Sequence, residues 1–305
     1  MKRRDLLRIS TAVGLASLLP GAAGAGARSP ASVGRARPGT ALSPLPAPVD
    51  GDIPVAVLIS DRAVVIDFAG PWTVFENVRL PGREAPPFRL YTVAETAAPI
   101  QASGGMIVTP NYALAAAPAP KVIVIPAQSE PSAAVIAWLR GAAAQADITM
   151  SVCTGAFVLA MTGLLAGKAV ATHHGFYAEL AAAFPDIQVR RGARFVDLGT
   201  IASAGGLSSG IDLALHVVAR YFGQSVAVST ADALEYQGQG WLDPDSNRAY
   251  AKPRVSTAQH PLCAVCQMDV DLATAPKSAY RGRSYYFCST DHKTLFDAHP
   301  DRFVV

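Results

Sequence analysis

Between residues 53 and 241, short runs of β-branched and aliphatic residues alternate with longer segments whose apolar residues recur every three or four positions. This alternation is typical of βα units built around a largely parallel sheet. We therefore expect one α/β domain over residues 53–242, long enough for a substantial core. The short runs predict strands at 53–60, 88–94, 122–125 and 148–152, and a hairpin of 195–198 with 200–204. The longer segments predict helices at 66–77, interrupted at Gly70-Pro71, and at 131–145, 155–162 and 211–222.

The segments on either side of this domain differ from it in composition. Residues 1–27 combine a basic start, an apolar stretch and small residues at their end, which is typical of a removable export signal. Arg3 and Arg4 resemble the twin-arginine motif, which predicts a periplasmic or secreted protein exported after folding. The alternatives are an ordinary secretory signal or an uncleaved anchor. Residues 28–52 are rich in Pro, Gly, Ser and Ala and predict a flexible linker, and the polar residues 243–259 predict a second one.

Net charge argues against some classes of partner. The chain has 26 Lys and Arg residues against 23 Asp and Glu residues, and residues 1–27 hold four of the former and one of the latter. Without that segment the balance is 22 to 22, so no basic surface for nucleic acid is indicated. No later run is apolar enough to span a membrane. We expect small molecules or metal ions as partners.

Cys153 is the first candidate for chemistry. It follows the predicted strand 148–152 and precedes Thr154-Gly155-Ala156 at the start of a predicted helix. A sharp turn there lifts a side chain off the end of a sheet, and the free N–H groups of the helix favour negative charge beside it. This argument predicts a lowered thiol pKa and a nucleophilic thiolate. The local sequence fits a cysteine packed in the core equally well.

Ligands of open α/β sheets bind beyond the carboxyl ends of the strands, and this selects three further residues. Asp67 is an acid within an apolar run after the first predicted strand, and its alternative role is a helix N-cap. His173 lies in a loop before a new helix, and its alternative role is a histidine satisfied by the backbone. Thr154 could offer a hydroxyl and an N–H group to a developing anion.

Several blocks of this domain resemble one family. Residues 67–75, 151–160 and 205–215 are similar, in the same order, to the PfpI superfamily of glutamine-amidotransferase-like proteins, and most of all to its isonitrile hydratase branch. The resemblance covers essentially all of residues 53–241. It implies a flavodoxin-like three-layer sandwich with a mostly parallel sheet.

The resemblance also implies roles for the candidates. Cys153 would be the nucleophile, Asp67 the acid or base beside it, and Thr154 a neighbour of the thiol, whereas His173 would lie near the thiol without being an essential base. The implied reaction adds water to an isonitrile and gives an N-substituted formamide, with no cofactor in the α/β domain. Members of the family often dimerise, so a homodimer is compatible with the resemblance.

Two positions depart from the family's pattern. The family usually has Pro-Gly-Gly after the central strand, where a backbone amide helps to form an anion hole, but here Pro126 is followed by Ala127 and Gln128. Ala127 is therefore an accessory candidate with a differently shaped loop. His174 stands where the hydratase branch commonly has Trp, which predicts a smaller and more polar pocket wall. Both changes concern the substrate more than the nucleophile.

Residues 260–305 hold three of the four cysteines and form a second, small domain. Cys263 and Cys266 lie on one Cys-x-x-Cys turn, and Cys288 and His292 have the i, i+4 spacing of one helix face. Four such side chains can close one tetrahedral metal site, and thiolates with one imidazole suit Zn(II) or Cu(I). A structural disulfide is the alternative in an oxidising compartment, although three cysteines cannot all pair internally.

The pattern Cys-x-x-Cys-x-Met, Tyr-Tyr-Phe-Cys-Ser and Phe-x-x-x-Pro in this segment resembles a YHS domain, a small module associated with metal-handling proteins. His292 takes the family's fourth position, which is Cys or His, and we expect His260 and His299 at the surface. The sequence thus favours an exported cysteine-dependent hydratase with a metal-binding module. The alternative is a non-catalytic periplasmic protein that binds metal or senses a ligand. A DNA-bound regulator is disfavoured by the export signal and by the lack of a helix-turn-helix pattern after Trp241.

Overall fold

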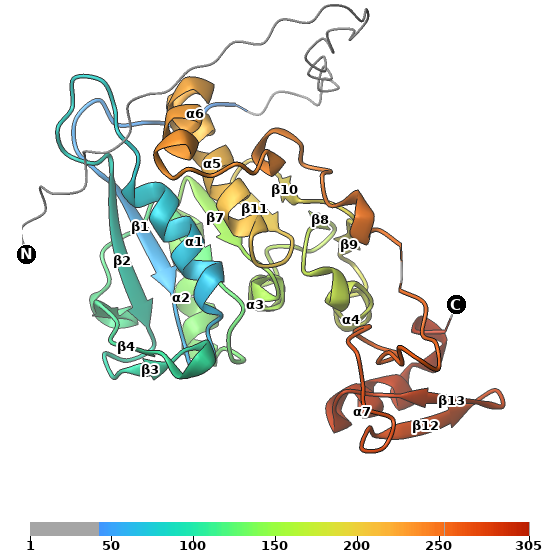
Figure 1. Cartoon of the computed structure of the whole chain (residues 1–305). Coiled ribbons are helices and arrows are strands. Elements are labelled where there is room, and N and C mark those ends of the chain that lie inside the picture. The colour runs from blue at the N-terminus through green and yellow to red at the C-terminus, as the bar shows by residue number, and fades with distance from the viewer. Residues whose placement is uncertain (1–42, 253, 305) are drawn as a thin grey trace, which may run out of the picture. The chain divides into compact units, whose positions relative to one another are not determined.

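The computed structural model describes residues 43–252 and 254–304, so the predicted export signal and residues 28–42 of the first predicted linker lie outside the described part. A seven-stranded sheet with the order β10-β11-β7-β6-β1-β2-β5 runs through the α/β domain (Figure 1). Its neighbouring strands are parallel, except that β10 and β11 are antiparallel. The strands are β1 (Ile53–Leu58), β2 (Phe88–Ala94), β5 (Tyr112–Ala113), β6 (Val122–Ile125), β7 (Ile148–Ser151), β10 (Phe195–Asp197) and β11 (Ile201–Ala204).

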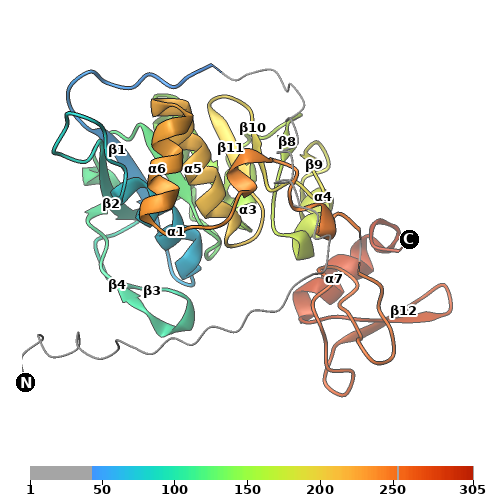
Figure 2. The ribbon, with the colours of Figure 1, turned by 45° about the horizontal axis from the view of Figure 1, so that its top comes forward.

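The sheet separates two hydrophobic cores. Successive residues of β1 point to opposite faces, so Val55 and Val57 pack into one core while Ala56 and Leu58 pack into the other. Helices α1 (Val65–Glu76), α5 (Ser209–Phe222) and α6 (Gln224–Ala233) cover the first face (Figure 2). Helices α2 (Ala133–Ala143) and α3 (Gly155–Met161) cover the second. Because both faces are covered, β6 is apolar at every position. The predicted flavodoxin-like α/β fold is confirmed.

Helix α1 continues through Gly70-Pro71, where the sequence predicted an interruption. Pro71 has no N–H group to donate to the carbonyl of Asp67 one turn earlier, but the buried face of the helix keeps it in place. Gly70 allows α5 to approach closely, because a Cβ atom there would lie 2.9 Å from Cγ1 of Ile211. The first turn of α1, which carries Asp67, is thereby fixed against α5 and the sheet.

Several elements carry too weak a periodic signal to be predicted. Helix α6 buries only Ala227, Thr230 and Ala231, so its apolar stripe is short. The others include β5, the two-residue strands β3 (Ile100–Gln101), β4 (Ile107–Val108), β8 (Ala169–Val170) and β9 (Gln188–Val189), and 3₁₀ helices at 103–105, 114–116, 174–176, 240–242, 248–250 and 300–302. The helix expected after the His173 loop is α4 (Tyr177–Ala183).

The C-terminal domain is built on a hairpin and one helix. Strands β12 (Lys277–Tyr280) and β13 (Arg283–Tyr286) are antiparallel, and Arg281 and Gly282 both have positive φ, as a two-residue hairpin turn requires. Helix α7 (Thr290–Ala298) follows, capped by the Ser289 hydroxyl, which accepts a hydrogen bond from the His292 N–H. A small core lies beneath them and contains Cys263, Val265, Cys266, Phe287 and Phe296.

The segment before β1 is partly anchored to the α/β domain. Leu45 is buried in the first core, and its N–H donates to the Arg220 carbonyl at 2.9 Å. This anchoring involves the end of the predicted 28–52 linker. Among the described residues, no helix combines the length and apolarity that a membrane crossing would need.

A substitution at Gly155 can test how closely α3 packs against the sheet. A Cβ atom at this position would lie 2.2 Å from the Ile125 carbonyl oxygen and 2.8 Å from that of Pro126, and backbone atoms cannot move aside cheaply. We expect Gly155→Ala to destabilise the α/β domain by about 3 kcal/mol or more. Gly141→Ala, in an exposed part of α2 with open space around it, should stabilise by about 0.5–1 kcal/mol. Urea unfolding followed by tryptophan fluorescence measures both, and equal effects would contradict this account.

Candidate functional site

Cys153 lies on a sharp turn between β7 and α3. Its φ of 58° is in the left-handed region, which residues other than glycine rarely adopt, and such strain is common at functional sites. Two hydrogen bonds hold this conformation: the Cys153 N–H donates to the Gly205 carbonyl, and the buried Thr172 hydroxyl donates to the Cys153 carbonyl, each at 2.9 Å. The cysteine is 6% exposed. The turn that the sequence predicted at this position is therefore present.

The Cys153 thiol is shielded from solvent, and among the described residues its one acidic neighbour is Asp67. Burial, and secondly the charge of Asp67, raise the pKa of Cys153 to about 12, although backbone N–H groups of Leu207 and Thr154 hydrogen-bond to the sulfur and lower it. The predicted lowering of the thiol pKa is thus wrong for the resting protein, because desolvation outweighs the helix N–H groups. At neutral pH Cys153 carries its proton.

Asp67 is fully buried beside the thiol, in the first turn of α1. Its Oδ2 accepts a hydrogen bond from the Ala127 N–H at 3.1 Å, whereas Oδ1 has no partner of normal geometry. Burial raises its pKa to about 6, although the Ala127 N–H and the Cys153 side chain both lower it. Asp67 is therefore a carboxylate at neutral pH, and the pair holds one proton, which lies on the sulfur.

The other predicted site residues lie around this pair in different ways. Thr154 directs its N–H at the sulfur, but its hydroxyl does not cap α3. The Ala127 amide binds Asp67 and so orients the acid. His173 accepts a hydrogen bond from the Gly175 N–H at Nδ1, and burial lowers its pKa to about 4, so the ring is neutral. Sequence reasoning missed Thr172 and Leu207, because a buried threonine and a backbone amide leave no recognisable motif.

A cavity of about 190 Å³ lies beside Leu207, whose N–H contacts the sulfur. It is lined by His173, His174, Arg194, Gly206, Leu207, Ser208, Asn247 and Tyr250. The rings of His174 and Tyr250 are stacked, with centroids 4.7 Å apart. Asn247 and Tyr250 belong to the segment predicted as a linker, so residues from 243–259 form part of the cavity wall. No periodic pattern could reveal this, because the only regular structure among the segment's described residues is a single 3₁₀ turn at 248–250.

The cavity is polar but nearly charge-balanced. The Arg194 guanidinium is paired with the fully buried Asp212, with Nε and Oδ2 2.6 Å apart, and Arg194 also donates to Asn247 and Ser208. The two histidines beside it have lowered pKa values, caused mainly by burial. The cavity therefore suits a small, uncharged molecule that can accept or donate hydrogen bonds.

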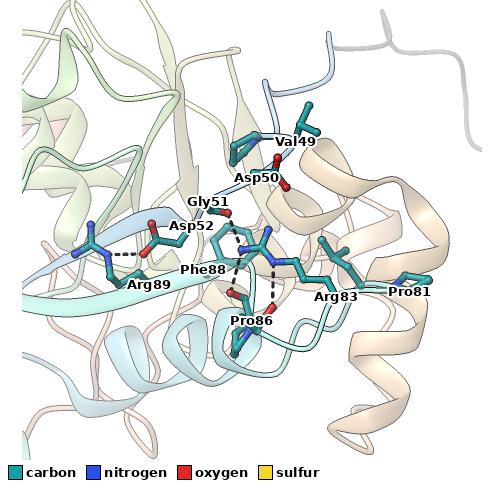
Figure 3. A pocket seen from close by; sticks show the side chains of 13 residues that line it. Val49, Asp50, Gly51, Asp52, Pro81, Arg83, Pro86, Phe88 and Arg89 are labelled. Atoms are coloured by element: carbon teal, nitrogen blue, oxygen red, sulfur yellow. Dashed lines mark hydrogen bonds and ion pairs between the residues drawn. The ribbon is translucent and has the colours of Figure 1, made fainter.

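A larger cavity of about 830 Å³ lies at the other end of the sheet, near the starts of β1 and β2 (Figure 3). Its arginines have internal partners, since Arg83 donates to the carbonyls of Gly51, Ala85 and Pro86 and Arg89 pairs with Asp52. Ligands of such sheets bind at the carboxyl ends of strands, whereas this cavity is at the amino ends. We therefore place the candidate site at Cys153.

The second candidate site is in the C-terminal domain. The ligand atoms of Cys263, Cys266, Cys288 and His292 all lie within 4.8 Å of one another. Sγ of Cys266 is 3.6 Å from Sγ of Cys288, and Nδ1 of His292 is 3.6 Å and 3.1 Å from the sulfurs of Cys263 and Cys288. Tetrahedral ligands about 2.3 Å from zinc are separated by about 3.8 Å. The four side chains therefore fit a single tetrahedral ion.

The cysteines of this cluster are free in the structure, as is Cys153. The Cys266 thiol, and secondly His292, hydrogen-bond to Cys263 and lower its pKa to about 3, despite the opposing effect of burial. The hydrogen bonds within the cluster therefore favour a thiolate, which is the form of cysteine that binds metals. His260 and His299 are exposed and outside the cluster, as expected.

The fold and the cysteine turn define the class of protein: an α/β protein with a cysteine on a sharp strand-to-helix turn at the carboxyl end of its sheet. Residues 54–220, more than half of the chain, match the sequence profile of the DJ-1/PfpI family, and residues 264–305 match that of the YHS domain. The chain belongs to the DJ-1/PfpI family and carries a YHS domain.

Three similar proteins illustrate the range of this family. Isonitrile hydratase of Pseudomonas putida is 28% identical over 187 residues, which are 60% of this chain and 78% of the hydratase. The HTH-type transcriptional regulator GbdR of Pseudomonas aeruginosa is 26% identical over 191 residues, 60% of this chain but only half of the regulator. A solved THiJ/PfpI family protein from Pseudomonas syringae shares the fold, with a TM-score of 0.55, 23% identity, and coverage of 68% of this chain and 84% of that one.

The raised pKa of Asp67 has a consequence for stability. A group whose pKa rises from 3.8 to about 6 on folding favours the folded state at low pH, and this contribution is lost as pH rises through 4 to 6. We expect Asp67→Asn, which removes the buried charge, to stabilise the α/β domain by up to about 3 kcal/mol at pH 8. The gain should vanish below pH 4.

Tryptophan fluorescence suits this measurement, because Trp72, Trp138 and Trp241 all lie within residues 53–242. Urea unfolding of wild type and variant at pH 4 and pH 8 gives the two free-energy differences. A difference that does not depend on pH, or a variant less stable at pH 8 than at pH 4 relative to wild type, would contradict the assignment of a buried carboxylate.

Proposed function

We propose that this protein is a cysteine-dependent hydratase that converts an isonitrile to an N-substituted formamide, and that its YHS domain binds a metal ion. The main support for the proposal is the buried pair of Cys153 and Asp67. The two side chains share one proton, and Cys153 lies on a strained turn. The similarity to the Pseudomonas putida isonitrile hydratase supports the choice of reaction.

The protonation of the pair suits the first step. Asp67 takes the thiol proton as substrate arrives, and the Cys153 sulfur attacks the terminal carbon of R–N≡C. Protonated Asp67 then returns the proton to that carbon, which gives a thioimidate, R–N=CH–S–Cys153. A pair with two protons would lack the base, and a pair with none would lack the acid.

The second step consumes water. Water adds to the thioimidate carbon as the nitrogen is protonated, and the tetrahedral adduct expels the sulfur, which regains its proton. The products are R–NH–CHO and the resting thiol, so the net change is the addition of one water to the isonitrile. The N–H groups of Leu207 and Thr154 stabilise the sulfur whenever it carries negative charge.

In the YHS domain, Cys263, Cys266, Cys288 and His292 would hold Zn(II) or Cu(I), for which soft thiolates and one imidazole are suitable ligands. Such an ion would cross-link the small domain, whose own hydrophobic core is limited. We further propose that residues 1–27 direct export, so that the protein acts in the periplasm or outside the cell on a small molecule.

The similarity to GbdR favours one second candidate. In that case the α/β domain would bind a small ligand in the cavity beside Leu207 without converting it. The matched part is half of the regulator's length, so the shared region concerns the α/β domain alone.

Catalysis is tested with purified, reduced protein and a panel of alkyl and aryl isonitriles, with formamide measured by mass spectrometry. We expect turnover by wild type, a loss of at least about 1,000-fold in Cys153→Ala, and a loss of about 100- to 10,000-fold in Asp67→Asn. The urea unfolding transition of each variant shows that it is folded. Binding of isonitriles without turnover by wild type would overturn the hydratase and favour the ligand-sensing candidate.

Metal binding is tested by elemental analysis of the full chain after exposure to Zn(II) and removal of free metal. Wild type should retain about one ion per chain, and His292→Ala should retain far less, because a tetrahedral site loses a ligand. His299→Ala changes an exposed histidine of the same domain and should bind as wild type does. Equal retention by both variants would place the metal elsewhere.

A further inference from the structure

His292 has a partner outside the YHS domain. Its Nδ1 faces the sulfurs of Cys263 and Cys288, while its other ring nitrogen, Nε2, is 2.9 Å from Oε2 of Glu179. Glu179 lies on α4 of the α/β domain, so this contact joins the two domains. Together the two domains form one compact part of the chain, residues 40–305. The ring is thus held between the cysteine cluster on one side and a carboxylate on the other.

The surroundings of Glu179 indicate that this contact is specific. Its side chain is 20% exposed and that of His292 is 14% exposed, so the pair is largely shielded from solvent. Among the described residues, Glu179 forms no other ion pair, and its buried Oε2 has no hydrogen-bond partner of normal geometry, so the 2.9 Å approach of His292 Nε2 is its closest polar contact. A carboxylate in such a place is costly without a donor, and the ring N–H of His292 is the donor available.

Neighbouring contacts hold α4 against the cluster. A Cβ atom on Gly175 would lie 2.8 Å from the Cys266 carbonyl oxygen, so only glycine permits this approach of the Cys-x-x-Cys turn. Phe176 packs on the small core of the YHS domain, and its ring centroid is 6.5 Å from that of His292. Arg302 donates to the Ala182 carbonyl at 2.7 Å. Glu179 is therefore placed by packing on both sides of it.

We propose that Glu179 is a positioning residue for the metal site, and that the site is completed across the two domains. A histidine that binds metal through one nitrogen commonly donates its other N–H to a carboxylate, which fixes the tautomer and the ring orientation and makes the imidazole a stronger ligand. Glu179 supplies this carboxylate to His292. The inference rests on the proposed metal site, and it adds that the metal fastens the YHS domain to α4.

This arrangement connects the metal site with the wall of the cavity beside Leu207. A 3₁₀ turn at 174–176 joins His173, which lines that cavity together with His174, to helix α4, and the ring of Phe176 in this turn lies near the rings of both His173 and His292. Metal binding in the YHS domain would therefore hold in place the segment that carries two residues of the cavity wall.

The test compares Zn(II) affinities of the full-length protein by competition with a chromophoric chelator. Removal of such a carboxylate typically weakens metal binding about 10- to 100-fold, which we expect for Glu179→Ala. Glu179→Gln keeps an oxygen that can accept the His292 N–H but loses the charge, so its affinity should be intermediate. Asp291→Asn is the matched control, because it removes an exposed carboxylate next to His292 that has no contact with the ring.

The outcomes separate this inference from the proposed metal site. If wild type binds no Zn(II), the metal site itself is wrong. If wild type binds and Glu179→Ala binds equally well, or if Asp291→Asn weakens binding as much, Glu179 has no positioning role. Absorption spectra of the Co(II)-loaded proteins give an independent readout, since an altered ligand orientation should change the d–d bands of Glu179→Ala but not those of Asp291→Asn.

Discussion

The arrangement of this protein depends on one buried contact, that of the Cys153 thiol with the Asp67 carboxyl group. Burial disfavours the charged form of both side chains. Together they hold a single proton at neutral pH, and the fold keeps them together at the carboxyl end of the sheet. Gly155 lets α3 approach the backbone of β6, and the packing of α1 on α5 places Asp67. The chemistry therefore follows from packing as much as from the residue types.

The main elements of the fold could be predicted from the sequence because their physical signals are local. A continuous apolar run predicted β6 and a run rich in β-branched and aromatic residues predicted β2, both with the observed limits, and the hairpin of β10 and β11 was predicted from two short runs. Helix α6 escaped prediction because it buries little, and the limits of α4, the helix expected after the His173 loop, could not be set because it is short. The course of α1 through Pro71 was also missed, since only tertiary packing keeps a helix intact at that position.

The candidate site was predictable in its residues but not in its electrostatics. Cys153 and Asp67 could be selected from their positions after strands. Whether the thiol pKa is raised or lowered, however, depends on how completely the site is shielded from water. Residues distant in sequence also act there: the Leu207 N–H lowers the thiol pKa, and the Thr172 hydroxyl holds the Cys153 carbonyl. Asn247 likewise joins the cavity from a segment without periodicity. The four residues of the C-terminal cluster were recognisable because their spacing is local, whereas Glu179 was not, because it lies in another domain.

The most direct test of the central claim is the pH dependence of alkylation of Cys153 by iodoacetamide, in wild type and in Asp67→Asn. Trypsin releases residues 141–168 as a peptide whose only cysteine is Cys153, so mass spectrometry can follow this thiol alone. If the pair shares one proton, the wild-type rate should rise through an inflection near pH 6, where Asp67 ionises. That inflection should be absent in Asp67→Asn. The same profile in both proteins would contradict the coupling of Cys153 to Asp67.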